Sequence, residues 1–308
     1  MTFRKGESFI VKDKTPVFPA TMPWPRFVDF TRQNTRFDAL HSLLQETKLP
    51  FKVVRLNGGK KPAAHFFISP AQAGSAKIVL VAHYDCVAGS PGANDNAAGV
   101  FILIETALKL MENAAAGWLI IFTDKEELES GESLRGQGSF VLADFFRVHS
   151  QCPTQFFIFD CCGSGDTLII STTADYLLKT EKGAGPINIQ NKLTLLRQTA
   201  LNKANETMQK FLLLPAPFSD DAGFLRAGIA AQLITTLPAR EASEFAQTVR
   251  KDPLYINALV NGALKKKRDQ NLFPETWRIV NTPNDTVERL RPEHFGAMAR
   301  FAAALCRP

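Results

Sequence analysis

The sequence has little of what marks secreted or membrane-spanning proteins. Its 308 residues include 5 cysteines, an odd number with an adjacent pair at Cys161 and Cys162, which is unlike a disulfide framework. No stretch approaches the roughly 20 uninterrupted apolar residues that a membrane-spanning helix needs. The N-terminus, Met1-Thr-Phe-Arg-Lys-Gly-Glu, is polar and lacks the apolar core of a signal peptide. We therefore expect a soluble, cytoplasmic protein with no membrane partner.

The composition is that of a globular chain with a small excess of positive charge. Hydrophobic residues make up 45% and charged residues 21%, as in ordinary soluble proteins. At roughly 100–200 residues per domain, the length allows one large domain or two smaller ones. The 36 Lys and Arg exceed the 30 Asp and Glu by 6, but basic and aromatic residues are not interleaved as in a nucleic-acid groove. We expect no nucleic-acid partner.

Short apolar runs alternate with helical patterns along the central chain. Residues 77–82, 118–123 and 155–160 form continuous apolar runs, which are typical of strands buried on both faces. Helical patterns follow at about 96–111 and 140–146. This alternation predicts a single α/β domain over residues 1–308, with a mostly parallel, mixed central sheet covered by helices on both faces.

Further elements are expected on either side of this region. They are a helix over 37–49, strands over 51–56, 65–69, 167–171 and 229–235, and a terminal helix over 292–305. Residues 1–32 are rich in proline and aromatics and predict an irregular N-terminal arm. Residues from about 238 to 275 are polar and predict a helical insertion into the same domain.

Acidic residues and one histidine follow the predicted central strands. In open α/β sheets, ligands bind beyond the carboxyl ends of the strands. Each residue alone has an ordinary explanation, because an Asp in such a place often caps a helix and a Glu pair is often solvated. Their coincidence at successive strand ends of one sheet favours a metal site instead. The residues concerned are His83, Asp85, Asp95, Glu126, Glu127 and Asp160.

Metal binding suits the chemistry of this set. Zinc takes imidazole and carboxylate ligands, and a catalytic zinc site leaves one position open. Carboxylates that converge without a cation would repel one another and raise their pKa values. Two divalent ions ~3.5–4 Å apart, bridged by one carboxylate, would offset this repulsion and activate a shared water. A second Glu beside a ligand Glu could then act as the general base.

Five segments from about Lys77 to the C-terminus resemble, in the same order, the M28 family of zinc aminopeptidases and the related glutaminyl cyclases. The resemblance is carried by the spaced HxD, ND, EE and D residues and implies the zinc aminopeptidase fold. The segments are VLVAHYDCVAGSPGANDNAAGV, IIFTDKEELESGESLRGQGS, FIFDCCGSGD, FSDDAGFLRAGIAAQLI and VNTPNDTVERL.

The resemblance implies two metal sites, one of which departs from the family pattern. By resemblance, His83, Asp95 and Asp160 hold one zinc, and Asp95 bridges to a second zinc held by Glu127 and a late residue. The family has a His there, in a segment like H-T-P-x-D-T, whereas this chain has Asn281. An amide oxygen is a poorer zinc donor than imidazole, so this second site is weakened. Glutaminyl cyclases use a single zinc at that site, so Asn281 counts more against a cyclase than against an aminopeptidase.

Three further residues acquire roles from the same resemblance. Glu126 is expected to be the general base that takes a proton from the attacking water. Asp85 is expected to orient the imidazole of His83 and fix its tautomer. Asp220, in the Ser-Asp-Asp segment, is expected to line the site near the amine of the substrate.

The function implied is metal-dependent removal of N-terminal amino acids from peptides or aminoacyl compounds. Zinc is the expected cofactor, as one or two ions, with manganese or cobalt as alternatives. Two other functions stay open: cyclisation of N-terminal glutamine, and a relative without catalysis because of Asn281. The sequence leaves the oligomeric state open.

Overall fold

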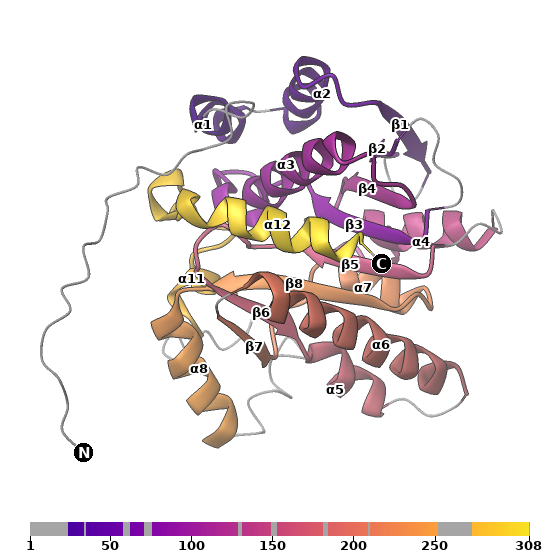
Figure 1. Ribbon diagram of the computed structural model, residues 1–308, viewed down its shortest axis with the longest axis vertical. Coiled ribbons are helices and arrows are strands. Elements are labelled where there is room, and N and C mark those ends of the chain that lie inside the picture. The colour runs from indigo at the N-terminus through magenta and orange to yellow at the C-terminus, as the bar shows by residue number, and fades with distance from the viewer. Residues whose placement is uncertain are drawn as a thin grey trace, which may run out of the picture.

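The fold is one α/β domain built on an eight-stranded mixed sheet with the strand order β1-β2-β4-β3-β5-β8-β6-β7 (Figure 1). The computed structural model describes residues 24–33, 35–57, 62–70, 76–128, 131–148, 153–180, 184–208, 210–251 and 273–307. The strands are β1 (Phe51–Leu56), β2 (Ala63–Ile68), β3 (Ile78–His83), β4 (Trp118–Thr123), β5 (Gln155–Phe159), β6 (Thr167–Ser171), β7 (Phe211–Leu214) and β8 (Ala231–Leu237).

Ten α-helices are found in the described part of the chain. They are α1 (Trp24–Arg32), α2 (Arg36–Glu46), α3 (Ala98–Glu112), α4 (Gly138–Val148), α5 (Thr173–Thr180), α6 (Ala184–Thr207), α7 (Asp220–Arg226), α8 (Ala239–Lys251), α11 (Glu275–Arg278) and α12 (Phe295–Leu305). Within those described residues, no helix is long and apolar enough to cross a membrane.

The centre of the sheet is parallel and its edges are partly antiparallel. Strand β3 pairs in parallel with β4 on one side and β5 on the other, and β5 pairs in parallel with β8. The hairpin of β1 and β2 is added antiparallel to β4, whereas β6 runs antiparallel to β8. The prediction of a mostly parallel, mixed sheet is confirmed.

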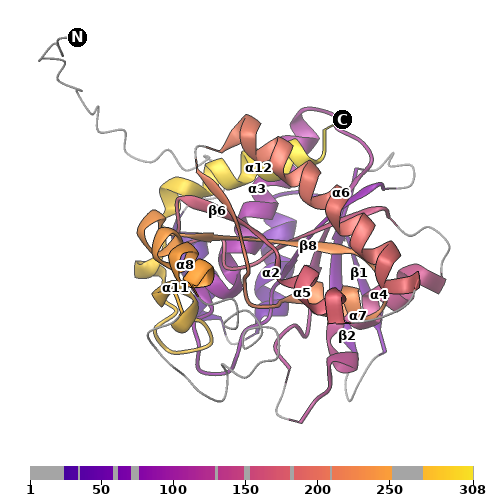
Figure 2. The same cartoon turned by 90° about the horizontal axis from the view of Figure 1, so that it is seen from below.

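Alternate residues of each central strand enter different halves of the core. Along β3, Leu80 and Ala82 belong to one buried cluster, and Val79 and Val81 belong to the other, as the period of two along a strand requires. The first cluster packs under α3, α6 and α12 (Figure 2), and the second under α4, α7 and α8. Burial on both faces explains why these strands have continuous apolar sequences.

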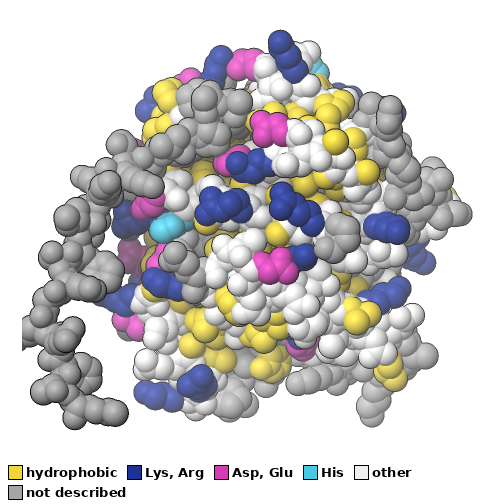
Figure 3. Space-filling model, viewed as in Figure 1, with side chains coloured by type: hydrophobic (Ala, Val, Ile, Leu, Met, Phe, Trp, Pro, Cys, Tyr) yellow, Lys and Arg dark blue, Asp and Glu magenta, His cyan; other side chains and the backbone are white. Residues whose placement is uncertain are grey.

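Charged side chains of both signs lie on the face of the molecule seen in Figure 3. On the face seen in Figure 3, lysine and arginine side chains are spread among acidic and apolar ones. Of the acidic residues predicted for the site, Asp95 and Asp220 are buried, whereas Asp85, Glu126, Glu127 and Asp160 are partly exposed.

Most predicted elements are present, but strand β7 and helices α5, α6, α7 and α11 were not predicted, and the expected arm and insertion differ in part. The last part of the expected irregular arm, residues 1–32, is helix α1; residues 1–23 lie outside the described residues. The expected insertion begins with helix α8, but residues 252–272 of it also lie outside the described part. Helix α6 was not predicted, because its buried side chains form only a narrow stripe in a polar sequence: Leu193, Leu196, Ala200 and Ala204.

His65, in strand β2, is a buried histidine whose environment affects its pKa. His65 has no exposed surface. Its Nδ1 accepts a hydrogen bond of 3.3 Å from the backbone N–H of Asp124, and its Nε2 has no partner. Burial lowers the pKa of His65 from 6.5 to about 4, so the imidazole stays neutral in the folded chain at neutral pH.

We predict that His65 makes the protein less stable in mild acid. Between pH 6.5 and about pH 4 the unfolded chain binds a proton at this residue that the folded chain does not, so the free energy of unfolding falls as pH falls. A difference of this size corresponds to about 3 kcal/mol. Urea unfolding at several pH values should show a shallower acid dependence for His65→Phe. His294→Gln, which leaves His65 in place, should keep the wild-type dependence; equal slopes for all three proteins would contradict the prediction.

Candidate metal centre

Three side chains converge beyond the carboxyl ends of the central strands. His83 is the last residue of β3, and Asp160 directly follows β5. Asp95 has a non-helical backbone in the turn Ala93–Ala97, which precedes α3. Nε2 of His83 is 3.0 Å from Oδ1 of Asp95 and 3.6 Å from Oδ1 of Asp160. One potential ligand atom from each residue lies within 4.8 Å of the other two.

The converging atoms fit a divalent cation. Nε2 of His83 and the Oδ1 atoms of Asp95 and Asp160 are buried and make no hydrogen bond of acceptable geometry. Leaving a buried polar group without a partner costs about 1–3 kcal/mol, more for a charged group. An imidazole and two carboxylates are the donors that zinc takes in proteins. A cation between them would satisfy all three atoms at once.

The pKa values point to the same need for positive charge. Burial, and next the charge of Asp160, raise the pKa of Asp95. Burial, followed by the charge of Asp95, raises the pKa of Glu127 to about 8. Burial also raises the pKa of Glu126 well above its usual value, although the nearby His83 opposes this. Low-dielectric surroundings thus disfavour several negative charges that a cation would stabilise.

Asp85 connects the imidazole to the glutamate pair. Its Oδ1 is 3.4 Å from Nδ1 of His83. The same carboxylate accepts hydrogen bonds from the backbone N–H groups of Glu126, at 3.3 Å, and Glu127, at 3.0 Å. The hydrogen bond of His83 Nδ1 is to the backbone carbonyl oxygen of Asp85, at 3.2 Å, so the orienting role expected of the carboxylate stays a prediction. The two backbone N–H contacts of that carboxylate explain how the loop after β4 is held beside the histidine.

Gln137, which the sequence did not single out, fixes the carboxylate of Glu126. Its Nε2 donates a hydrogen bond of 3.2 Å to Oε1 of Glu126, and its Oε1 accepts one of 3.1 Å from the hydroxyl of Ser139. Helix α7 approaches closely here: a Cβ on Gly223 would lie 2.2 Å from Oγ of Ser139. Only glycine at position 223 leaves room for the side chains of Gln137 and Ser139. Nothing in the sequence pattern predicts this contact.

Asp285, also without a predicted role, anchors the loop that carries Asp95. Its two carboxylate oxygens accept hydrogen bonds from the backbone N–H groups of Asn94, at 2.9 Å, and Asp95, at 3.0 Å. Asn94 in turn accepts a hydrogen bond of 2.8 Å from the N–H of Gly163, in the loop after β5. Asp285 lies in the VNTPNDTVERL segment that resembles the family. This position was the one indication in the sequence that Asp285 contributes to the site.

The remaining predicted residues lie at the margins of the cluster. Nδ2 of Asn281, which is exposed, donates a hydrogen bond of 3.3 Å to Oε2 of Glu127. Asp220 begins α7 and is fully buried. Its Oδ2 accepts a 2.5 Å hydrogen bond from the hydroxyl of Thr123, at the end of β4, while its Oδ1 has no partner. Burial raises the pKa of Asp220 to about 6.

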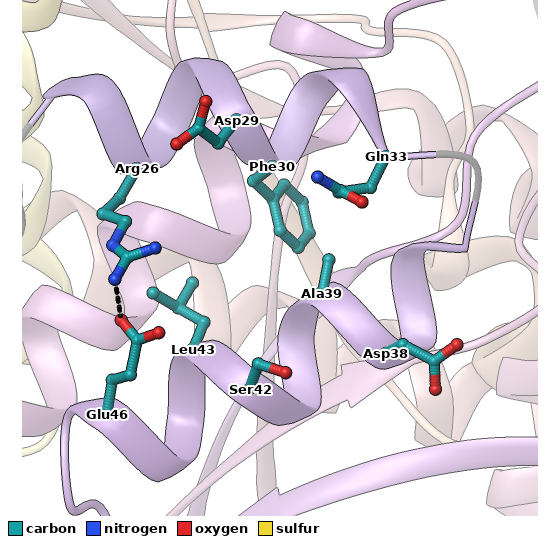
Figure 4. Close-up of a pocket in the computed structure, with 9 residues that line it drawn as sticks. All are labelled: Arg26, Asp29, Phe30, Gln33, Asp38, Ala39, Ser42, Leu43 and Glu46. Carbon is teal, nitrogen blue, oxygen red and sulfur yellow. Dashed lines mark ion pairs between the residues drawn. The ribbon is translucent and has the colours of Figure 1, made fainter.

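A surface cavity of about 260 Å³ lies apart from these residues, between α1 and α2 (Figure 4). Phe30 and Leu43 supply apolar lining, and an ion pair of 3.0 Å between Arg26 and Glu46 closes one side. None of the predicted site residues lines this cavity.

An imidazole and two carboxylates at the carboxyl edge of a parallel sheet are the donor set of a metal-dependent α/β enzyme. Comparison with known families agrees: the sequence profile of peptidase family M28 matches residues 67–306. The chain therefore belongs to peptidase family M28, as its resemblance predicted. A comparison with curated proteins finds no match.

Solved structures of similar fold include aminopeptidases and a cyclase. LapA aminopeptidase of Legionella pneumophila is 16% identical with a TM-score of 0.61, over 92% of this chain and 69% of that chain. Glutaminyl cyclase of Porphyromonas gingivalis is 16% identical with a TM-score of 0.60, over 91% and 94% of the two chains. BSAP, a zinc aminopeptidase from Bacillus subtilis, is 19% identical with a TM-score of 0.50, over 80% of this chain. The match spans about half of BSAP, 49% of its chain. These likenesses establish the fold.

We predict that Asp285→Asn destabilises the protein by about 1–3 kcal/mol, because an amide NH₂ cannot accept a hydrogen bond and leaves one buried backbone N–H without a partner. Urea unfolding measures the loss. Asp144→Asn is the control, since Asp144 is half exposed and pairs with Arg147 at 3.1 Å, a surface ion pair worth about 0–1 kcal/mol. Equal losses in the two variants would contradict the anchoring role of Asp285.

Proposed function

We propose that the chain is a metal-dependent aminopeptidase that hydrolyses the first peptide bond of its substrate. Membership of peptidase family M28 supports hydrolysis of peptides. The single observation that carries the proposal is the convergence of His83, Asp95 and Asp160, each with an unsatisfied buried atom. Beside this cluster lies a second carboxylate, Glu126, whose orientation is fixed by Gln137.

His83, Asp95 and Asp160 are the residues that would hold the metal. Zinc, when bound there, supplies a Lewis acid that polarises the scissile carbonyl and lowers the pKa of a water molecule. Asp85 keeps the imidazole in position, because its backbone carbonyl oxygen lies 3.2 Å from Nδ1 of His83 and its carboxylate lies 3.4 Å from the same atom. A proton on Nδ1 leaves the lone pair of Nε2 directed at the cluster.

Glu126 is the proposed general base. Its Oε1 accepts a hydrogen bond from Gln137, which leaves Oε2 to take a proton from the attacking water. The same oxygen then delivers that proton to the nitrogen of the leaving amine. Burial raises the pKa of Glu126 well above its usual value, so this carboxylate binds a proton more readily than an exposed glutamate does.

Asp220 is the proposed partner of the substrate's N-terminal ammonium group. It is fully buried, and its Oδ1 has no hydrogen-bond partner. A carboxylate oxygen of this kind gains a charge-assisted hydrogen bond when a cationic amine enters. This contact would favour substrates with a free N-terminus.

We predict that Glu126→Gln lowers kcat by a factor of about 10²–10⁴, the usual size of a general-base contribution. The metal content and KM should stay close to wild type, since Glu126 is not a proposed ligand. Zinc-, manganese- and cobalt-loaded proteins should be assayed on a panel of aminoacyl amides, with metal content measured in parallel. Glu112→Gln, at the exposed end of α3, is the control and should retain full activity.

Two results would contradict this proposal. One is folded, metal-loaded wild-type protein that hydrolyses no aminoacyl amide. The other is a Glu126→Gln variant as active as Glu112→Gln. Removal of the metal with a chelator should abolish activity, and its return should restore it.

A second assay separates hydrolysis from cyclisation of N-terminal glutamine. Cyclisation attacks the side-chain amide with the N-terminal amine and releases ammonia, whereas hydrolysis of the peptide bond releases free glutamine. We expect free glutamine and no ammonia from glutaminyl peptides, because the family's cyclases rely on the site that Asn281 weakens. Ammonia released at the rate of peptide consumption would identify the cyclase instead.

A further inference from the structure

By the family resemblance, Asn281 stands at the position of a ligand to a second metal ion, and in the structure its amide donates a hydrogen bond to Glu127. Its backbone has a φ of 60°, in the left-handed region that Asn tolerates. Its Nδ2 lies 3.3 Å from Oε2 of Glu127 and donates to it. An amide nitrogen offers no lone pair to a metal, and its hydrogen bond occupies Oε2 of Glu127.

The two halves of the centre therefore differ in their donors. In the first half, His83, Asp95 and Asp160 bring together an imidazole nitrogen and two carboxylate oxygens. In the second half, Glu127 has one oxygen engaged by Asn281 and one buried oxygen without a partner. A second ion there would replace the Asn281 hydrogen bond and gain at best a neutral amide oxygen, which is a weak zinc ligand.

We propose that this chain binds one divalent ion, held by His83, Asp95 and Asp160, and that Asn281 excludes a second ion beside Glu127. The inference rests on the ligands named under the proposed function. It goes further by fixing the number of ions and the residue that limits it.

Counting bound metal in one pair of variants tests this directly. Asn281→His supplies the missing imidazole, and histidine also tolerates a positive φ. Asn284→His is the matched control, because Asn284 is an exposed asparagine of the same turn, three residues further on. After equilibration with zinc in a metal buffer, native mass spectrometry should find one ion in the wild type, two in Asn281→His and one in Asn284→His.

A second pair of variants assigns the single ion to its half of the centre. His83→Ala should lose the ion, whereas Glu127→Gln should retain it with an affinity within a few-fold of wild type. Circular dichroism and thermal unfolding confirm that each variant is folded. In manganese-loaded protein, an electron paramagnetic resonance signal from two coupled ions should appear only in Asn281→His, because bridged ions lie ~3.5–4 Å apart.

Several results would overturn the inference: two ions in the wild type, none in folded wild type, one ion in Asn281→His, or loss of the ion in Glu127→Gln but not in His83→Ala. None of these measurements depends on turnover. A one-ion protein that hydrolyses nothing would refute the aminopeptidase proposal and leave the inference standing, whereas an active two-ion wild type would do the reverse.

Discussion

His83 has no exposed surface and lies between the carboxylates of Asp95 and Asp160. Burying charged groups is costly unless each finds a partner. One imidazole cannot satisfy two carboxylates and a nearby glutamate pair, even with a proton on both nitrogens. Backbone N–H groups supply part of the compensation, since Asp85 and Asp285 each accept two of them. The negative charge that stays uncompensated is the reason to expect a cation.

The sheet makes this crowding possible. Parallel β3, β4 and β5 end at the same edge, and their registers place His83 opposite Thr123 and Val81 opposite Ile158. Packed apolar layers on both faces hold those ends in place. The loops are held as closely: a Cβ on Gly138 would lie 1.8 Å from the carbonyl oxygen of Asp124, so only glycine allows the loop after β4 to fold back. Without this support, the carboxylates would turn toward water instead of toward one another.

The sequence predicted the elements whose residues follow a local hydrophobic pattern. The central strands were recognisable because burial on both faces leaves a continuous apolar run, and His83 and Asp160 were recognisable because they follow such runs. Helix α6 was missed because its buried stripe is narrow. Gln137 and Asp285 were missed for a different reason. Asp285 acts on Asn94 across 191 positions of sequence, and Gln137 matters only because Glu126 and Ser139 surround its amide. Such contacts arise from the fold. The only signal in the sequence was the place of Asp285 in the VNTPNDTVERL segment.

The segment around Asn281 resembles the family segment by sequence but has an asparagine where the resemblance implies a histidine ligand. A second metal ion is one reason for such a segment to keep its shape, but the structure provides another. The carboxylate of Asp285, four residues after Asn281, accepts a hydrogen bond of 3.0 Å from the backbone N–H of Asp95. The backbone carbonyl of Asp285 accepts another, of 3.2 Å, from the N–H of Ala93. The segment thus positions Asp95, a proposed ligand of the first ion. This anchoring accounts for the fold of the segment without a second ion.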